Sequence, residues 1–366
     1  MIIFVSHMNS WPDTRILQLF RIEVPIIQAP MAGAVGSVMA IAVSQAGGLG
    51  SLPCAMLSAD QVRAEISAIR QSTSKPLNVN FFCHRAPQPD REREIAWKQR
   101  LQAYYIELGL DPEAPLASSG RMPFDPQTCD LMLELKPEII SFHFGLPSKD
   151  LLARLKATGV KILSSATTVD EARWLENEGC DAVIAQGYEA GGHRGMFLND
   201  DISTQVGTLA LVPQVVDAVR VPVIAAGGIA DARGVVAAFA LGASAVQIGT
   251  AYLLCPEAKI SSVHRRALSN ARDNQTALTN VFTGRPARSI VSRFVREVGP
   301  MSDLAPPFPL AAAALAPLRS KSEAIGSEDF IPLWSGQAAR LARELPASEL
   351  TKQLAAETLA KLKSMG

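Results

Sequence analysis

Eight short apolar runs recur along this chain of 366 residues and constrain its fold more than any other feature. Each run is almost continuously hydrophobic and is bounded by Gly or Pro, which is the pattern of strands buried on both faces of a parallel sheet. Helical periodicity separates them, so the order is strand, helix, strand throughout. The runs are residues 24–30, 49–53, 76–82, 138–145, 161–166, 182–187, 221–228 and 245–250.

Strict alternation of strand and helix predicts parallel βαβ units, and eight units close a filled barrel. The predicted fold is therefore α/β, a parallel (β/α)₈ TIM barrel, with an open doubly wound sheet as the alternative. The five clearest intervening helices are residues 38–46, 59–71, 149–158, 169–177 and 232–241. Four of these helices are followed by Gly, where a left-handed residue is favoured: Gly47, Gly159, Gly179 and Gly242.

Two connections are too long for simple crossovers, and they predict an elaboration of the barrel. Residues 1–254 form the barrel, within which residues 84–123 are an insertion that joins a lid. Residues 255–340 form the lid or substrate subdomain, and residues 341–366 form a helix that returns to the barrel wall. Whether residues 1–7 belong to the native protein is left open, because a second Met follows them.

Composition excludes several classes of partner. The chain has 35 basic and 35 acidic residues and no long run of like charge, so neither nucleic acid nor an anionic membrane has electrostatic support. No apolar stretch is long enough to span a bilayer, and the N-terminus lacks a signal peptide. The five cysteines are widely spaced without a CxxC pair, which favours a reducing cytoplasm. A small-molecule site is expected.

Unusual residues collect at the carboxyl ends of the predicted strands, where barrels of this kind carry function. They are Pro30, Met31, Asn80, His143, Gln186, Gly227, Gly228, Gly249 and Thr250. A buried amide or imidazole needs a partner, and a polar ligand supplies one. The glycines after the last two strands suit a phosphate bound by backbone N–H groups, although glycines also simply turn the chain.

The sequence QGYEAGGHRG, residues 186–195, follows the sixth strand and is the densest signal. Its glycines allow the backbone to approach a flat ligand, and His193 is presented from a loop as a candidate proton acceptor. A loop-bracing role is the alternative. For His143 a catalytic and a hydrogen-bonding role are equally compatible with an inward strand position. No metal site is expected, because the two histidines lack an HxH or HExxH context.

The ordered set of motifs resembles the class I nitronate monooxygenases, formerly called 2-nitropropane dioxygenases. The resemblance starts at Val24 and rests on PIIQAPMAG (25–33), NVNFF (78–82), HFGLP (143–147), QGYEAGGHRG (186–195), AAGGI (225–229) and QIGT (247–250). It implies an FMN-binding barrel with a lid, and oxidation of alkyl nitronates by O₂ to a carbonyl compound and nitrite without NAD(P)H. Propionate 3-nitronate is the characteristic, toxic substrate of this family.

The resemblance also implies the site residues. FMN would contact Ala29, Pro30, Met31, Asn80, Gln186, Gly191, Gly227, Gly228, Gln247, Ile248, Gly249 and Thr250, while His193 and His143 are the candidate catalytic residues. Tyr188, Tyr252 and Trp334 are candidate pocket walls, and equally candidates for the core.

Other functions remain open from sequence alone. An FMN-dependent enoyl-acyl-carrier-protein reductase is similar around EAGGH, and an NADH:quinone reductase uses the same barrel. A non-catalytic flavin-binding protein is the alternative from another class. The physiological nitronate and the choice between monomer and homodimer are not decided by the residues.

Overall fold

The computed structural model describes residues 11–88, 90–115 and 122–365. In these residues eight parallel strands form one sheet in the order β1-β9-β8-β6-β5-β4-β3-β2. The strands are β1 Ile26–Gln28, β2 Gly50–Pro53, β3 Leu77–Phe82, β4 Ile139–His143, β5 Lys161–Ala166, β6 Ala182–Gln186, β8 Val223–Ala226 and β9 Ala245–Ile248. Each lies within one of the eight predicted runs, so the strand prediction is confirmed.

The sheet closes on itself between β1 and β2, which excludes the open doubly wound alternative. Ile27 and Leu49 form a parallel bridge there. Leu49 N–H donates to the Ile26 carbonyl at 2.9 Å, and Gln28 N–H donates to the Leu49 carbonyl at 3.0 Å. The fold is therefore the predicted (β/α)₈ barrel.

The helices that connect the strands cover the outside of the barrel. They are α2 Ser37–Gln45, α3 Ala59–Ser72, α5 Pro126–Leu135, α6 Lys149–Lys156, α7 Val169–Asn177, α8 Thr208–Ala218 and α9 Ala232–Ala240. The four glycines predicted to end helices all have positive φ: Gly47 at 89°, Gly159 at 83°, Gly179 at 93° and Gly242 at 90°. Helices α5 and α8 were not predicted.

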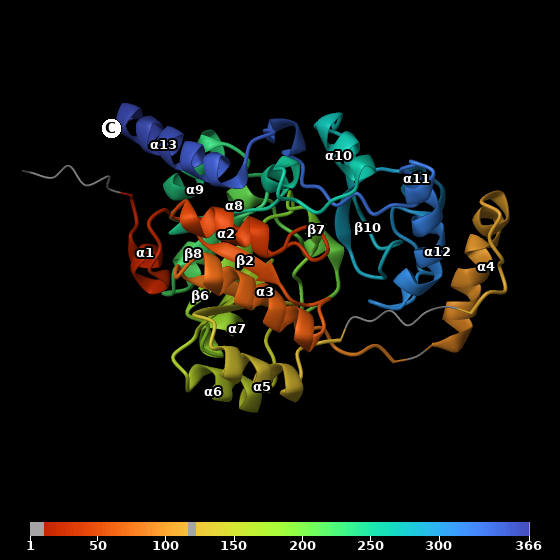
Figure 1. Ribbon diagram of the computed structural model, residues 1–366, viewed down its shortest axis with the longest axis horizontal. Helices are drawn as coiled ribbons and strands as arrows, with labels where there is room; N and C mark the ends of the chain where they lie inside the picture. Colours follow the sequence, from red (N-terminus) through yellow and green to blue (C-terminus); the bar gives the residue numbers. More distant parts are fainter. Residues whose placement is uncertain (1–10, 89, 116–121, 366) are drawn as a thin grey trace, which may run out of the picture.

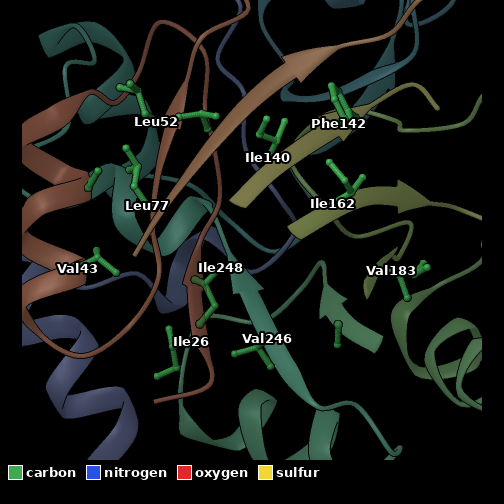
Figure 2. Packing of buried hydrophobic residues seen from close by; sticks show 14 of the residues in the cluster. Ile26, Val43, Leu52, Leu77, Ile140, Phe142, Ile162, Val183, Val246 and Ile248 are labelled. Atoms are coloured by element: carbon green, nitrogen blue, oxygen red, sulfur yellow. The ribbon is translucent and has the colours of Figure 1, made fainter. Parts of the chain in front are cut away.

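Alternation of side chains along each strand divides the core into two layers. Outward residues such as Ile26, Val246, Ile140 and Ile162 pack against the helices, and Val43 of α2 meets them from outside (Figure 2). Inward residues form the lumen layer: Ile27, Leu49, Ile139, Leu163, Ile184, Ile224 and Ala245. Helix α1, Arg15–Phe20, closes the amino-terminal end of the barrel with Ile16 and Phe20.

A second hydrophobic cluster lies to one side of the barrel. It joins α4, Arg91–Glu107, to α11, Arg293–Val298, and α12, Ala311–Ala324, at the right of Figure 1. Beside it, a small antiparallel sheet has the order β10-β11-β7, from Thr276–Thr279, Ala287–Ile290 and Gly192–His193. The segment after β3 thus packs with the segment after β9.

Helix α13, Ala347–Met365, runs along the top of Figure 1 and packs against α2 and α9. Helix α10, Ser262–Ser269, and the short 3₁₀ segments η1 Ile202–Thr204, η2 Thr250–Leu254 and η3 Ala339–Leu341 complete the described elements. Among the described residues no helix is both long and apolar enough to cross a bilayer.

The barrel wall leaves no room for a side chain at Gly50, which allows a stability test. A Cβ there would lie 2.1 Å from the Ala40 carbonyl oxygen of α2. Gly50→Ala is therefore expected to lower the free energy of unfolding by about 3 kcal/mol. Gly234→Ala is the matched control. Gly234 lies inside α9, and a Cβ there would be at an ordinary contact distance of 3.4 Å from Ile229.

The control is expected to raise the free energy of unfolding by about 0.5–1 kcal/mol, since Ala is the better helix former. Urea unfolding followed by circular dichroism measures both values. Equal stability of the wild type and Gly50→Ala would show that β2 and α2 do not approach as closely as described.

Candidate active site

Three strand-end side chains meet just above the apolar layer of the lumen. Ile139, Leu163 and Ile184 face the lumen, and side chains two or four residues further along the same strands point the same way. These are Ser165 on β5, Gln186 on β6 and His143 on β4. A polar layer therefore lies at the carboxyl ends of the barrel strands, where catalysis is expected.

His143 uses both of its ring nitrogens. Nε2 lies 3.1 Å from the His193 carbonyl oxygen, and Nδ1 lies 3.0 Å from Ser165 Oγ. Because a carbonyl only accepts, Nε2 carries the hydrogen and Nδ1 accepts from the Ser165 hydroxyl. The pKa of His143 is lowered to about 4, mainly by burial and in addition by the nearby Arg285 and Arg194, against the opposing effect of its hydrogen bond to His193. His143 is thus neutral at pH 7.

Gln186 binds the same loop from the neighbouring strand. Its Nε2 donates to the His193 carbonyl at 3.0 Å, and its Oε1 accepts from Gly195 N–H at 2.7 Å. A Cβ on Gly195 would lie 2.9 Å from both His143 Cε1 and Ser165 Cβ. Only glycine therefore lets the loop pass this close to the strand ends.

The His193 side chain points to the other side of this loop, into an aromatic cluster. His193 belongs to β7 and pairs with Ala287 of β11. Its ring centroid lies 5.3 Å from those of Phe308 and Trp334 and 6.1 Å from that of Phe144. Its Nε2 lies 2.9 Å from Thr283 Oγ1. The imidazole is therefore partly enclosed by aromatic rings, three of its neighbours coming from residues 255–340.

Backbone N–H groups suited to an anion lie at the ends of β8 and β9. The N–H groups of Gly227, Gly228 and Gly249 donate to no acceptor within the part of the chain that the structure describes. Gly227 and Gly228 have φ of 114° and 70°, values that other residues rarely adopt. Unpaired donors at this end of a barrel are the usual elements of a phosphate site.

The other predicted cofactor residues border these donors. A Cβ on Gly249 would lie 3.4 Å from Ala29 Cβ and 3.5 Å from Met31 Sδ, so the ends of β1 and β9 are adjacent. Ala29, Pro30, Met31, Gln247, Gly249 and Thr250 are all partly exposed, in contrast to the buried strands below them. Thr250 Oγ1 accepts from Gly336 N–H at 2.9 Å.

Three of the predicted contacts are restricted by their surroundings. The amide nitrogen of Asn80 donates to the carbonyl and the hydroxyl of Ser141 at 3.1 and 2.9 Å. Gly191 packs against the 335–336 backbone so closely that a Cβ would lie 2.5 Å from Gly336 N. The Ile248 side chain points outward beside Ile26 (Figure 2), so only its backbone faces the barrel end.

The three aromatic candidates have different environments. Trp334 contacts His193 as described, whereas Tyr252 is fully buried with its hydroxyl 2.8 Å from Thr351 Oγ1 of α13. For Tyr252 the core interpretation is therefore the right one. Tyr188 is 36% exposed and stacks under the Arg288 guanidinium at 4.7 Å.

Sequence reasoning missed Thr283 and Phe308, which contact the His193 ring. Neither follows a barrel strand, and the position of both depends on how residues 281–310 fold back over β7. The motif HRG did contain one further signal, because it places an arginine within the glycine-rich stretch of residues 186–195. Arg194 has no exposed surface.

A (β/α)₈ barrel with unpaired backbone N–H groups at the ends of β8 and β9 and a histidine held over the strand ends is typical of enzymes that act on small molecules at the carboxyl end of the barrel. A family model described as nitronate monooxygenase matches residues 13–357. The chain therefore belongs to the nitronate monooxygenase family, a family of flavoenzymes, and is an oxidoreductase.

Known proteins are similar over nearly the full length. Nitronate monooxygenase of Pseudomonas aeruginosa is 45% identical, with 94% of this chain and 98% of that protein covered. The structure of nitroalkane oxidase from Streptomyces ansochromogenes matches with a TM-score of 0.86 at 38% identity, covering 95% of this chain and 99% of that one. FabK from Thermotoga maritima matches with a TM-score of 0.74 at 29% identity, covering 96% and 97%.

The depressed pKa of His143 predicts a loss of stability in acid. Unfolded histidine titrates near pH 6.5 and folded His143 near 4, so between these values the unfolded state binds more protons and stability falls as pH falls. At pH 5 the slope contributed by His143 is about 1 kcal/mol per pH unit. Above about pH 7 the contribution is constant.

Urea unfolding at several pH values checks this effect against His143→Gln, which cannot titrate. The variant is expected to show a shallower fall of unfolding free energy between pH 6.5 and 4. Identical slopes for the two proteins would mean that His143 is protonated in the folded state.

Proposed function

We propose that this protein oxidises alkyl nitronates with O₂ to a carbonyl compound and nitrite, with FMN as the bound flavin and without NAD(P)H. Propionate 3-nitronate is the proposed type of substrate. The observation that carries the proposal is the position of His193, held by its backbone to two barrel strands while its ring lies in an aromatic cluster. The names of the similar proteins, a nitronate monooxygenase and a nitroalkane oxidase, support the same chemistry.

The residues present fit FMN. The unpaired N–H groups of Gly227, Gly228 and Gly249 would hold its phosphate, and Thr250 adds a hydroxyl beside them. Ala29, Pro30 and Met31 would border one side of the ring system. FMN, when bound, accepts electrons from the nitronate and delivers them to O₂.

The second N–H of the Gln186 amide remains for the ring or the ribityl chain, because its nitrogen carries two hydrogens and donates one of them to His193. Both hydrogens of the Asn80 amide are directed to Ser141, so Asn80 would contact the ring or the ribityl chain through its amide oxygen. Gln247 and Gly191 would border the ribityl chain. Ile248 would contribute its backbone alone, since its side chain lies in the outer layer.

His193 is proposed as the group that accepts a proton from a neutral nitroalkane. The Thr283 hydroxyl lies 2.9 Å from Nε2 and 3.4 Å from the Arg285 carbonyl, to which it can donate. When it does so, Thr283 accepts the hydrogen of Nε2, and the lone pair of the ring is at Nδ1. His143 is proposed to act through the His193 carbonyl, because both of its own nitrogens are engaged.

The reductase alternatives are less well supported. The relatives that match this chain at 45% and 44% identity are both named nitronate monooxygenase. We also propose a cytoplasmic location, with which the five free cysteines agree.

Substrate oxidation gives the first test of this function. The purified protein should carry about one FMN per chain, released by heat without a covalent link. Under an oxygen electrode, adding propionate 3-nitronate should start oxygen uptake and nitrite release with no nicotinamide present. Rapid anaerobic bleaching of the flavin by NADH, with the nitronate inert, would favour a reductase.

His193→Asn separates the two substrate forms. Asn keeps a polar group of similar reach but cannot accept the proton, so turnover of a neutral nitroalkane should fall by about 10² to 10⁴-fold. Turnover of the preformed nitronate should fall much less, because it needs no base. FMN content measured on the same sample reports whether the loop still holds the cofactor.

The nitronate serves as the internal control in that experiment. Original rates with both forms would show that His193 is not the base. Loss of FMN from the variant would instead favour the loop-bracing interpretation of His193.

A further inference from the structure

Arg194 is the neighbour of His193 in the chain and points to the opposite face of β7. Its side chain has no exposed surface. Nη1 donates to the Gly187 carbonyl at 2.6 Å, and Nη2 donates to the Gln186 carbonyl at 2.7 Å. The planar guanidinium thus binds two successive peptide groups directly after β6, which is a geometry that only arginine offers.

The third nitrogen of Arg194 starts a hydrogen-bonded chain that passes through the half-buried Gln205. Nε donates to Gln205 Oε1 at 2.8 Å, and Gln205 Nε2 donates to Thr167 Oγ1 at 3.0 Å. Thr167 Oγ1 in turn donates to Glu171 Oε2 at 2.7 Å. Two neutral side chains therefore join a buried cation to a buried carboxylate that it does not touch.

Glu171 holds the far end of the same loop. It belongs to the first turn of α7 and is 1% exposed. Its Oε1 accepts from Phe197 N–H at 2.6 Å and from Leu198 N–H at 3.3 Å. A buried charge is costly unless its hydrogen bonds are satisfied. Here Arg194 donates to the backbone of residues 186–187, and Glu171 accepts from the N–H groups of residues 197–198 as well as from the N–H and hydroxyl of Thr167.

This arrangement bears directly on His193. Arg194 fixes the peptide groups of Gln186 and Gly187, and the Gln186 side chain holds the His193 carbonyl and Gly195 N–H. Arg194 therefore fixes the position of the His193 ring indirectly, from the other face of the strand and through Gln186.

We propose that Arg194, through the chain to Glu171, is the positioning residue for proton transfer to His193. The inference rests on the proposed function. In the step concerned, the α C–H bond of the nitroalkane breaks and the proton forms an N–H bond on the His193 ring. The electron pair of the C–H bond moves into the nitro group, which gives the nitronate and an imidazolium. Arg194 touches neither reactant.

The geometry of this step is demanding, whereas oxidation of a preformed nitronate does not need it. A misplacement of about 1 Å costs about 10²-fold in a proton transfer that depends on alignment. Lys at position 194 would keep the charge but lose the planar fork. Arg194→Lys therefore tests geometry with the charge retained.

The experiment compares Arg194→Lys, Gln205→Ala and the control Arg63→Lys as FMN-loaded enzymes. Gln205→Ala interrupts the hydrogen-bonded chain between Arg194 and Glu171 but leaves both carbonyl contacts of Arg194. Arg63 lies on the outside of the barrel, where it forms an exposed ion pair at 2.7 Å with Glu134. The kcat, the KM and the pH profile are measured with neutral nitroethane and with ethyl nitronate.

Arg194→Lys is expected to lower kcat for nitroethane about 10 to 100-fold more than kcat for the nitronate. Gln205→Ala should show the same selectivity with a smaller loss, and Arg63→Lys should match the wild type with both substrates. The KM for the nitronate should stay within about two-fold. The acidic limb of the nitroethane profile should persist in the variant, because the slowed proton transfer limits turnover more strongly than in the wild type.

An equal loss with both substrates, in proportion to lost FMN or folded protein, would reduce Arg194 to a structural role and overturn the proposal. Unchanged selectivity in both variants would overturn it too. If Arg194→Lys does not fold, Gln205→Ala decides the matter by the same criterion. A wild-type enzyme inert with nitronate and nitroethane would contradict the proposed function itself, and would be seen before any variant is compared.

Discussion

The carbonyl oxygen of His193 accepts hydrogen bonds from two barrel strands, and the rest of the site depends on this interaction. His143 of β4 donates to it at 3.1 Å and Gln186 of β6 at 3.0 Å. These bonds hold β7 over the strand ends, where it can pair with β11. The β10-β11-β7 sheet and the aromatic residues near His193 thereby have a fixed place relative to the barrel. One backbone atom thus connects the core of the fold to the proposed chemistry.

Three arginines near the loop of residues 186–198 donate to backbone carbonyls and neutral side chains and form no ion pair with a carboxylate in the described part of the chain. Arg194 donates to two carbonyls and an amide, Arg285 donates to the Met196 carbonyl, and Arg288 donates to the Tyr188 carbonyl and to Thr276. The charges of Arg285 and Arg194 disfavour protonation of His143, whose pKa lies near 4 mainly because of burial. The same positive surroundings suit a substrate that is itself an anion.

Much of this fold could be predicted from sequence because its signals are local. A strand buried on both faces is a short apolar run, and a left-handed residue after a helix is usually Gly, as at Gly47 and Gly242. The candidate residues could be placed at strand ends for the same reason, since barrels of this kind carry function there. Alternation along a strand could also have shown that Ile248 and Gln247 face opposite ways, which the resemblance did not distinguish.

The remainder of the site depends on contacts between distant segments, for which the sequence holds no periodic signal. Strand β7 is two residues long and exists only because β11 pairs with it. Thr283 and Phe308 reach His193 from a segment without barrel periodicity. The partners of Arg194 are backbone carbonyls, which carry no sequence identity, and Gln205 and Glu171 lie 11 and 23 positions from it in the chain.

The primary deuterium isotope effect on kcat/KM tests the central claim, that an aligned His193 removes the α-proton before oxidation. Nitroethane deuterated at the α-carbon is compared with the unlabelled compound, and each is also supplied as the preformed nitronate. The account predicts a clear primary effect with the neutral substrates and none with the nitronates, whose transferable proton is already gone. Equal rates for labelled and unlabelled neutral nitroethane would contradict it.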